Sequence, residues 1–287
     1  MNYDLIALDL DGTLVAAGER ISAASRDAVA DATAAGIKVV PCTGRAWREA
    51  ADVLRDVPGL DVGVFSSGAV VADFRSGEVL NTSGFDALLA LRLVETLRGL
   101  PHAVLVFQDV RETGRDFLIA GDGELTENTR GWFEEKNLAV ERIAEPTVHD
   151  LRQSLRVGVV AAGTAAHDAE AAVRKRFGDR VNAHLLAGLA VAGSQDDPPV
   201  YLLEVFPAGT HKWRGLAWLA DHLNVPHARV AAIGDELNDL AMLRHAGLGV
   251  AMGQAGDAVR SVADRETASC LDDGVAAAIG KILAGEW

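Results

Sequence analysis

Two aspartates close the first apolar stretch of the chain, which reads LIALDLDGTL over residues 5–14. Asp9 and Asp11 are two residues apart, so on a strand their side chains would point to the same side. Two carboxylates in one place could attack an electrophile, exchange a proton or bind a cation. The stretch alone also fits a strand that ends in a simple turn, and later features must separate these interpretations.

Three further apolar stretches also lead into polar residues. These are Thr43, Gly44 and Arg45 after the second stretch, Ser66, Ser67 and Gly68 after the third, and Asp235, Glu236, Asn238 and Asp239 after the fourth. Ligand sites of open parallel sheets lie at the carboxyl ends of the strands. If the four strands are neighbours, at least three carboxylates converge at one edge of the sheet.

Converging carboxylates need a compensating charge, because like charges disfavour each other's ionisation. Mg²⁺ fits, since it needs only one or two carboxylates plus substrate oxygens. Thr43-Gly44 offers a hydroxyl and backbone N–H groups as a phosphate cradle, and Lys212 begins a predicted helix. Together these groups indicate phosphoryl transfer, in which a carboxylate nucleophile can form an aspartyl-phosphate. Taken singly, each has an ordinary structural explanation, such as an exposed helix lysine.

The elements that must position these residues alternate between strand and helix at both ends of the chain. We expect strands over 5–10, 37–44 and 61–71 with helices over 22–36 and 46–57, then helices over 211–224 and 236–247 with strands over 228–235 and 248–253. The alternation predicts an α/β fold with a Rossmann-like, doubly wound parallel sheet.

The pattern changes between these two ends. We expect helices over 87–100, 125–137 and 165–178, strands over 103–109, 116–121, 155–163 and 200–206, and a polar loop over 194–199. This order is typical of α+β structure. The sequence therefore predicts a discontinuous core, residues 1–82 and 207–287, with an inserted α+β domain over 83–206.

Composition narrows the class of protein. The 287 residues carry a formal net charge of −14, which argues against a nucleic-acid or anionic-membrane partner but allows a small anionic substrate. No signal peptide or membrane-length apolar stretch is visible, and Cys42 and Cys270 form neither a disulfide framework nor a metal-ligand pattern. A cytoplasmic location is the default expectation, and the sequence says nothing about oligomeric state.

The order DLDGT, TGR, lysine and GDELND around a central insertion resembles the haloacid dehalogenase (HAD) superfamily. More narrowly, it resembles the Cof-type phosphatases, whose α/β cap is inserted between the third core strand and the lysine motif. The stretches HAGLGVAMGQA and DDGVAAAI also resemble this subfamily. The inserted domain resembles the cap only in size and position.

The resemblance implies a role for each matching residue. Asp9 would be the nucleophile and Asp11 the general acid and base. The metal would be held by Asp235, Asp9 and the backbone carbonyl of Asp11, with Asp239 as a supporting carboxylate. The residues that would hold the phosphoryl oxygens are Thr43, Gly44, Lys212 and Asn238. Arg45 follows its motif as in the family, but an ion pair explains it equally well.

Three positions depart from the family pattern. Ser67 replaces the asparagine of Asn-Gly-Ala, Trp213 replaces the glycine after the lysine, and Gln254 replaces the asparagine of VAMGNA. None of these changes removes a catalytic group. Ser67 and Gln254 put substrate contacts at those positions in doubt, and Trp213 either crowds the lysine loop or packs on the core.

The resemblance implies a Mg²⁺-dependent phosphatase that hydrolyses a small phosphorylated metabolite, such as a sugar phosphate. The inserted domain would act as a lid, but His102, Asp109, Arg111 and Arg115 fit a solvated hairpin as well as a specificity site. A phosphomutase of the same superfamily and a non-catalytic metabolite-binding module are the alternatives. The intact acidic and lysine motifs speak against the binding module.

Overall fold

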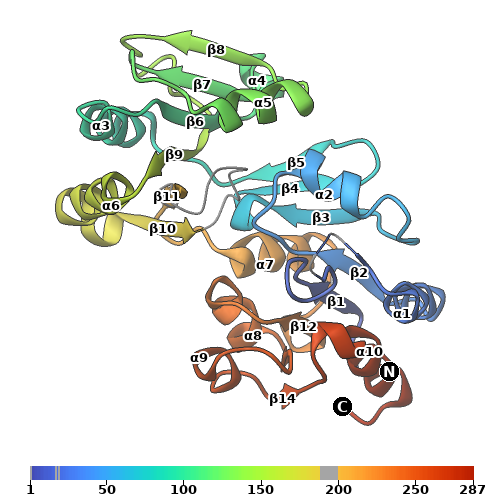
Figure 1. Cartoon of the computed structure of the whole chain (residues 1–287). Helices are drawn as coiled ribbons and strands as arrows, with labels where there is room; N and C mark the ends of the chain where they lie inside the picture. Colours follow the sequence, from blue (N-terminus) through green and yellow to red (C-terminus); the bar gives the residue numbers. More distant parts are fainter. Residues whose placement is uncertain (1, 17, 19, 188–199) are drawn as a thin grey trace. The chain divides into compact units, whose positions relative to one another are not determined.

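The computed structural model describes residues 2–16, 18, 20–187 and 200–287 (Figure 1). The chain forms two compact units, here called the core (Met1–Thr82 and His211–Trp287) and the cap (Ser83–Thr210). The chain therefore re-enters the core at 210/211, whereas the sequence suggested 206/207. The predicted polar loop over 194–199 lies outside the described residues. Within the described part of the chain, no helix has the length and apolarity needed to cross a bilayer.

The core is built on a parallel sheet with the strand order β14-β13-β12-β1-β2. Its strands are β1 (Leu5–Leu8), β2 (Lys38–Pro41), β12 (Val230–Gly234), β13 (Leu248–Ala251) and β14 (Arg265–Glu266). Strand β3 (Val62–Phe65) continues the row beside β2 through a parallel bridge between Cys42 and Val64. Strands β1, β12 and β13 are buried along their whole length, as expected when helices cover both faces of a sheet.

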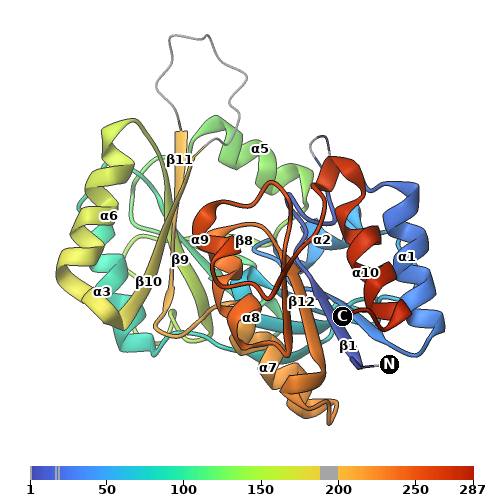
Figure 2. The same ribbon diagram turned by 90° about the horizontal axis from the view of Figure 1, so that it is seen from below.

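Helices cover both faces of this core sheet (Figure 2). Helices α1 (Ala23–Ala34) and α10 (Gly274–Ala284) pack together on one side, and α7 (Lys212–His222) and α8 (Leu240–His245) lie on the other. Leu216 and Met242 from α7 and α8 share one apolar cluster with Val40 and Ala232 of the sheet. Short helices α2 (Trp47–Val53) and α9 (Asp257–Arg260) complete the core. The predicted doubly wound α/β fold is confirmed.

The third predicted strand, over 61–71, is wrong as a single element. Strand β3 ends at Phe65, and Ser66, Ser67 and Gly68 follow with φ angles of 49°, 56° and 95°. Three successive left-handed residues reverse the chain, so β4 (Val70–Asp73) returns antiparallel to β3 and β5 (Val79–Thr82) follows it. The predicted helix over 236–247 is likewise divided, into a 3₁₀ turn (Leu237–Asp239) and α8.

The cap contains a mixed six-stranded sheet with the order β10-β11-β9-β6-β7-β8. Its strands are β6 (Val104–Gln108), β7 (Phe117–Ala120), β8 (Val140–Ile143), β9 (Ser154–Ala162), β10 (Val181–Ala187) and β11 (Val200–Pro207). Helices α3 (Ala87–Leu97) and α6 (Thr164–Phe177) cover one face, and α5 (Glu127–Glu135) packs on the other, over β6 and β7. The hairpin between β6 and β7 contains the short helix α4 (Val110–Thr113). Strands β8 and β10 were not predicted from the sequence.

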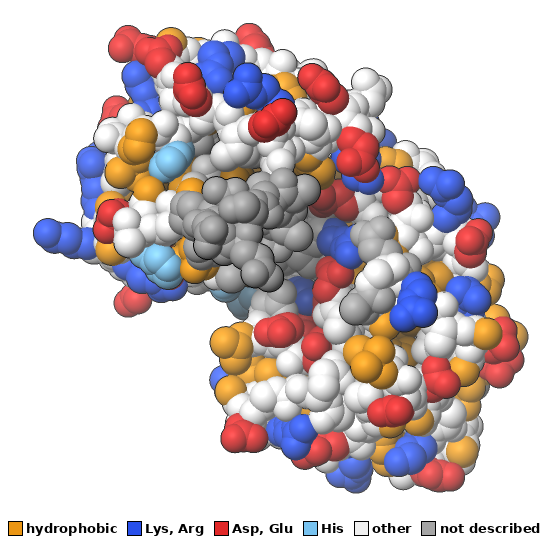
Figure 3. Space-filling view, viewed as in Figure 1, with side chains coloured by type: hydrophobic (Ala, Val, Ile, Leu, Met, Phe, Trp, Pro, Cys, Tyr) orange, Lys and Arg blue, Asp and Glu red, His pale blue; other side chains and the backbone are white. Residues whose placement is uncertain are grey.

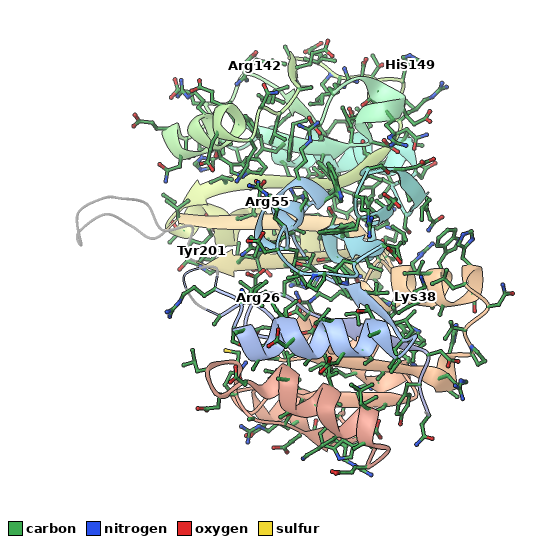
Figure 4. The ribbon with its side chains drawn as sticks, turned by 90° about the vertical axis from the view of Figure 1, so that its right-hand side faces the viewer. Arg26, Lys38, Arg55, Arg142, His149 and Tyr201 are labelled. Carbon is green, nitrogen blue, oxygen red and sulfur yellow. The ribbon has the colours of Figure 1, made fainter. Side chains whose placement is uncertain are left out.

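Charged side chains of both signs are interspersed over the described surface seen in Figure 3. Some of them form exposed pairs, such as Lys38 at the start of β2, which lies 3.1 Å from Asp61 (Figure 4). In the cap, the ring of Tyr201 on β11 packs edge-on against His167 of α6 with 5.0 Å between ring centroids.

Candidate active site

Three carboxylates meet where the two central core strands end. Asp9 follows β1 and Asp235 follows β12, and these strands are parallel neighbours. Asp239 lies in the 3₁₀ turn after β12. One oxygen of each carboxylate lies within 4.8 Å of the others, and all three side chains are buried. The convergence expected at this edge of the sheet is present.

Lys212 enters this acidic cluster from the first residue of α7. Its Nζ donates hydrogen bonds to Asp9 Oδ1 and, at 2.6 Å, to Asp239 Oδ1, and the side chain is only 1% exposed. The turn after β3 packs against the start of α7. A Cβ at Gly68 would lie 2.2 Å from the carbonyl oxygen of His211, so only glycine fits there. An exposed helix lysine is therefore excluded, and Lys212 is part of the site.

Burial and mutual charge control ionisation in the cluster. Burial raises the pKa of Asp9 well above its ordinary value, the Asp239 carboxylate raises it further, and Lys212 opposes both effects. Burial alone would lower the pKa of Lys212, but the carboxylates of Asp239 and Asp9 raise it overall, so the ammonium stays charged. One cation therefore does not fully compensate the carboxylates around it.

Asp235 accepts hydrogen bonds from side chains of two other loops. Thr13 Oγ1 donates to its Oδ1 at 2.8 Å, and Gln254 Nε2 donates to its Oδ2 at 3.2 Å. Burial raises the pKa of Asp235, and these two hydrogen bonds act against that rise. Gly12 passes directly over the carboxylate with a φ of +81°, where a Cβ would lie 2.3 Å from Oδ2. The DLDGT stretch thus needs its glycine to fit over Asp235.

Asp239 holds its neighbours in place through hydrogen bonds. Its Oδ2 accepts the backbone N–H groups of Asp235 and Glu236, each at 3.0 Å, and its Oδ1 accepts Lys212. Both oxygens are therefore already engaged, which favours a positioning role. The neighbouring Asn238 is exposed, and within the described chain no hydrogen bond joins its side chain to the cluster.

Asp11 lies outside the buried cluster, with a side chain that is 58% exposed. Arg45 holds it through two contacts, from Nε to Oδ2 at 3.0 Å and from Nη2 to Oδ1 at 2.6 Å. The sequence left open whether Arg45 serves the site or forms an ion pair. In this structure Arg45 forms an ion pair with Asp11 within the core. Asp9 and Asp11 do not share one environment, since the first is buried with Lys212 and the second faces solvent with Arg45.

The Thr43-Gly44 loop continues directly from β2 beside the end of β1. The N–H of Cys42 bonds to the carbonyl of Leu8 at 2.7 Å, immediately before Asp9 in the chain. Thr43 is fully buried, its Oγ1 accepts the N–H of Arg45 at 3.1 Å, and its carbonyl accepts the N–H of Ser67 at 3.0 Å. The loop is therefore fixed in place next to the nucleophile candidate, as a phosphate cradle requires.

The donor set fits a hard divalent cation. Three carboxylates face one ammonium, which leaves two negative charges in excess when all three acids are ionised. Within the described residues, the Oδ2 of Asp9 accepts no hydrogen bond, and each oxygen of Asp235 accepts one. Carboxylates with spare lone pairs are the ligands that Mg²⁺ takes in proteins. Asp9 and Asp235 are thus the acids best placed to hold an ion.

A family model described as haloacid dehalogenase-like hydrolase matches residues 6–279. The chain belongs to this family. This haloacid dehalogenase-like hydrolase is 29% identical over 272 residues to the Bacillus subtilis 5-amino-6-(5-phospho-D-ribitylamino)uracil phosphatase YitU, covering 95% of this chain and 94% of that protein. It is also 29% identical over 272 residues to the Escherichia coli pyridoxal phosphate phosphatase YbhA, covering 92% and 93%.

Solved structures agree with the family membership. A haloacid dehalogenase-like hydrolase from Bacteroides thetaiotaomicron superposes with a TM-score of 0.73 at 26% identity, covering 98% of this chain and 99% of that one. The resemblance read from DLDGT, TGR and GDELND is confirmed.

Two residues of the site in this haloacid dehalogenase-like hydrolase, Thr13 and Gln254, were not predicted from the sequence. In the sequence, Thr13 stands out only as part of DLDGT and Gln254 only as a departure from the family pattern, yet both donate hydrogen bonds to Asp235. Gln254 also borders a pocket of about 450 Å³, which is lined by Asp11, Gly12, Val15, Ala16, Gly18, Arg45, Asp235, Gln254, Cys270 and Leu271. Local periodicity cannot reveal that Thr13, 222 positions away along the chain, and Gln254, 19 positions away, lie against Asp235. Trp213 packs against the apolar core cluster that contains Leu216, so its bulk does not displace Lys212.

Proposed function

We propose that this hydrolase is a Mg²⁺-dependent phosphatase that cleaves a small phosphate monoester through an aspartyl-phosphate on Asp9. The observation that carries the proposal is the buried contact of Lys212 with Asp9 beside Asp235, with Asp11 held nearby at the surface of the core. Relatives over almost the whole chain are phosphatases of an aminouracil phosphate and of pyridoxal phosphate. They support a metabolite-sized substrate without naming it.

In the first step, a carboxylate oxygen of Asp9 attacks phosphorus and the bond to the leaving oxygen breaks. Lys212 and the N–H groups of the Thr43-Gly44 loop stabilise negative charge on the phosphoryl oxygens. Asp11 gives a proton to the leaving oxygen, so the product departs as an alcohol. In this structure Arg45 occupies both oxygens of Asp11, so the ion pair must open before Asp11 can carry and donate this proton.

In the second step, water attacks phosphorus and the bond to Asp9 breaks. Asp11 takes the proton of the attacking water, inorganic phosphate leaves, and both aspartates return to their starting states. Asp239 keeps Lys212 and the turn after β12 in place throughout. Asn238, exposed on that turn, would contact the phosphoryl group only when substrate is bound.

The metal would be held by Asp9, Asp235 and the backbone carbonyl of Asp11. When bound, it supplies positive charge that neutralises the phosphoryl oxygens. In its absence, burial and the Asp239 carboxylate raise the pKa of Asp9 above its ordinary value, against the opposing effect of Lys212. A nucleophilic Asp9 must be ionised, which explains why this chain would need a cation beside it.

The test is release of inorganic phosphate from a panel of phosphorylated sugars, nucleotide precursors and cofactors. We expect release with Mg²⁺, loss of release in EDTA, and loss of release in Asp9→Asn. Release that survives EDTA would contradict the metal requirement, and release by Asp9→Asn would contradict the nucleophile. Phosphoryl transfer between sugar positions with no released phosphate would replace the phosphatase by a phosphomutase.

A further inference from the structure

One side-chain amide, that of Gln254, joins three separate parts of the core. Its Nε2 donates to the carbonyl oxygen of Gly12 at 2.5 Å and to Asp235 Oδ2 at 3.2 Å. Its Oε1 accepts the backbone N–H of Cys270 at 3.1 Å. The amide therefore ties the DLDGT loop to the acidic turn after β12 and to the segment before α10.

The direction of this amide follows from its partners. The opposite orientation would place Oε1 against a carbonyl oxygen and a carboxylate oxygen, and would face the Nε2 donors toward the Cys270 N–H. Only the observed orientation satisfies all three contacts. Gln254 consequently acts as a donor toward the Asp235 carboxylate.

The backbone around Gln254 is anchored independently of its side chain. The N–H of Met252 bonds to the carbonyl of Gly234, and the N–H of Gly253 bonds to the carbonyl of Ala268, each at 3.0 Å. A Cβ at Gly253 would lie 2.8 Å from the N atom of Ser269, so the two segments are in close contact. The side chain thus extends from a fixed loop, and changing it leaves these backbone contacts in place.

We propose that Gln254 is a positioning residue for the metal site, and that it sets the affinity for the divalent cation by orienting Asp235 and the Gly12 peptide. The inference rests on the proposed function, because it assumes that Asp235 holds the ion. Thr13 and Gln254 each donate to a different oxygen of Asp235, so the pair fixes the plane of the carboxylate. Groups that orient metal ligands from outside typically change metal affinity by 10- to 100-fold when they are removed.

The length of the Gln254 side chain determines which groups its amide can contact. Gln254 spans from its own loop to both Gly12 and Asp235, and asparagine is one methylene shorter. Asparagine at this position would therefore lose at least one of the two donor contacts, unless the loop moved. The departure from the family's asparagine is in this view a change in how the metal carboxylate is held, and the substrate need not touch it.

The test uses the near-isosteric variant Gln254→Met, which keeps the length of the side chain but removes the amide. Binding of Mn²⁺ is measured by electron paramagnetic resonance without substrate, and the Mg²⁺ concentration for half-maximal phosphatase activity is measured separately. We expect the Mn²⁺ dissociation constant and the Mg²⁺ requirement to rise about tenfold, with kcat at saturating Mg²⁺ within about threefold of the original. The melting temperature of the metal-free protein should fall only slightly, because the side chain is exposed and the backbone around it is anchored by its own hydrogen bonds.

Ser261→Ala is the matched control, since its exposed hydroxyl bonds only locally, to the carbonyl of Ala258. Thr13→Val removes the other donor on Asp235 and should weaken Mn²⁺ binding in the same direction. Unchanged Mn²⁺ affinity in Gln254→Met would overturn the inference and leave the proposed function intact. A loss of kcat that saturating Mg²⁺ cannot restore would also overturn it. Absence of Mn²⁺ binding by the unsubstituted protein would overturn the proposed function as well.

Discussion

Core and cap each bury a charged cluster, and the two clusters are balanced differently. In the cap, Arg156 on β9 bonds to Glu204 on β11, and their side chains are only 14% and 8% exposed. The guanidinium lies over the ring of Phe107 at 5.4 Å and near that of Phe117 at 6.0 Å. One positive charge meets one negative charge, with aromatic faces covering the cation.

The core cluster has no such balance. Lys212 contacts Asp9 and Asp239, and Asp235 lies within the same group, so carboxylates outnumber cations. A balanced pair such as that of the cap can serve the fold alone. This imbalance leaves a buried acid with a raised pKa, which lowers the stability of the fold. It is typical of a site that binds a cation or a substrate.

The largest effect should come from removing the cation of the core cluster. Lys212→Met leaves Asp9 and Asp239 without their shared partner and deprives the phosphoryl group of its ammonium. We expect kcat for p-nitrophenyl phosphate to fall by about 10³-fold, the scale seen when a charge that stabilises phosphoryl transfer is lost. Activity within tenfold of the original protein would show that Lys212 serves the fold alone, like Arg156 in the cap.

Breaking the balanced pair should affect stability. Arg156→Met strands the Glu204 carboxylate in the cap and should lower the free energy of unfolding by about 3 kcal/mol, whereas the double variant Arg156→Met with Glu204→Leu should recover much of that loss. Urea unfolding followed by far-ultraviolet circular dichroism measures both. A double variant less stable than the single one would mean that the pair adds more than charge compensation.

The smallest effect should come from breaking an exposed ion pair of the core, that of Arg229 and Asp4. The hydrogen bond from Arg229 lowers the pKa of Asp4, and both side chains are about two-fifths exposed. Because the folded-state pKa is lowered, its contribution is present above the unfolded value of about 3.9 and is lost as pH falls through the folded value. Asp4→Asn should therefore lower the melting temperature slightly at pH 7, and less in high salt. A difference that did not shrink as the pH falls below about 3.9 would contradict this assignment.

The residues of the site could be predicted from the sequence more accurately than the turns around them. Asp9, Asp235 and Lys212 follow strand ends or begin a helix, so element boundaries and sheet topology were enough to bring them together. The single strand expected over 61–71 failed because Ser66 and Ser67 adopt positive φ angles, which their residue types do not announce. The contacts of Thr13 and Gln254 with Asp235 depend on how separate loops meet in the folded core, which no local pattern encodes.

The cap shows the same limit. Its helices α3, α5 and α6 follow clear apolar periodicity, but strands β8 and β10 were missed. Strand β8 is only partly buried, with outward-facing Glu141 and Arg142, so its sequence lacks the alternation that marks a strand. The balanced pair of Arg156 and Glu204 lies on two strands 48 residues apart, and only the register of β9 and β11 makes them neighbours.

The central claim is that Asp9 carries the phosphoryl group during turnover. The direct measurement is acid quenching of the protein during steady-state turnover with Mg²⁺ and a phosphate ester, then borohydride reduction and peptide mass spectrometry. An aspartyl-phosphate at Asp9 would be reduced to the alcohol, so the peptide containing residues 5–14 should change mass only when substrate was present. Rapid turnover with an unmodified Asp9 and a modification elsewhere, or with none under conditions that trap acyl phosphates, would contradict the mechanism.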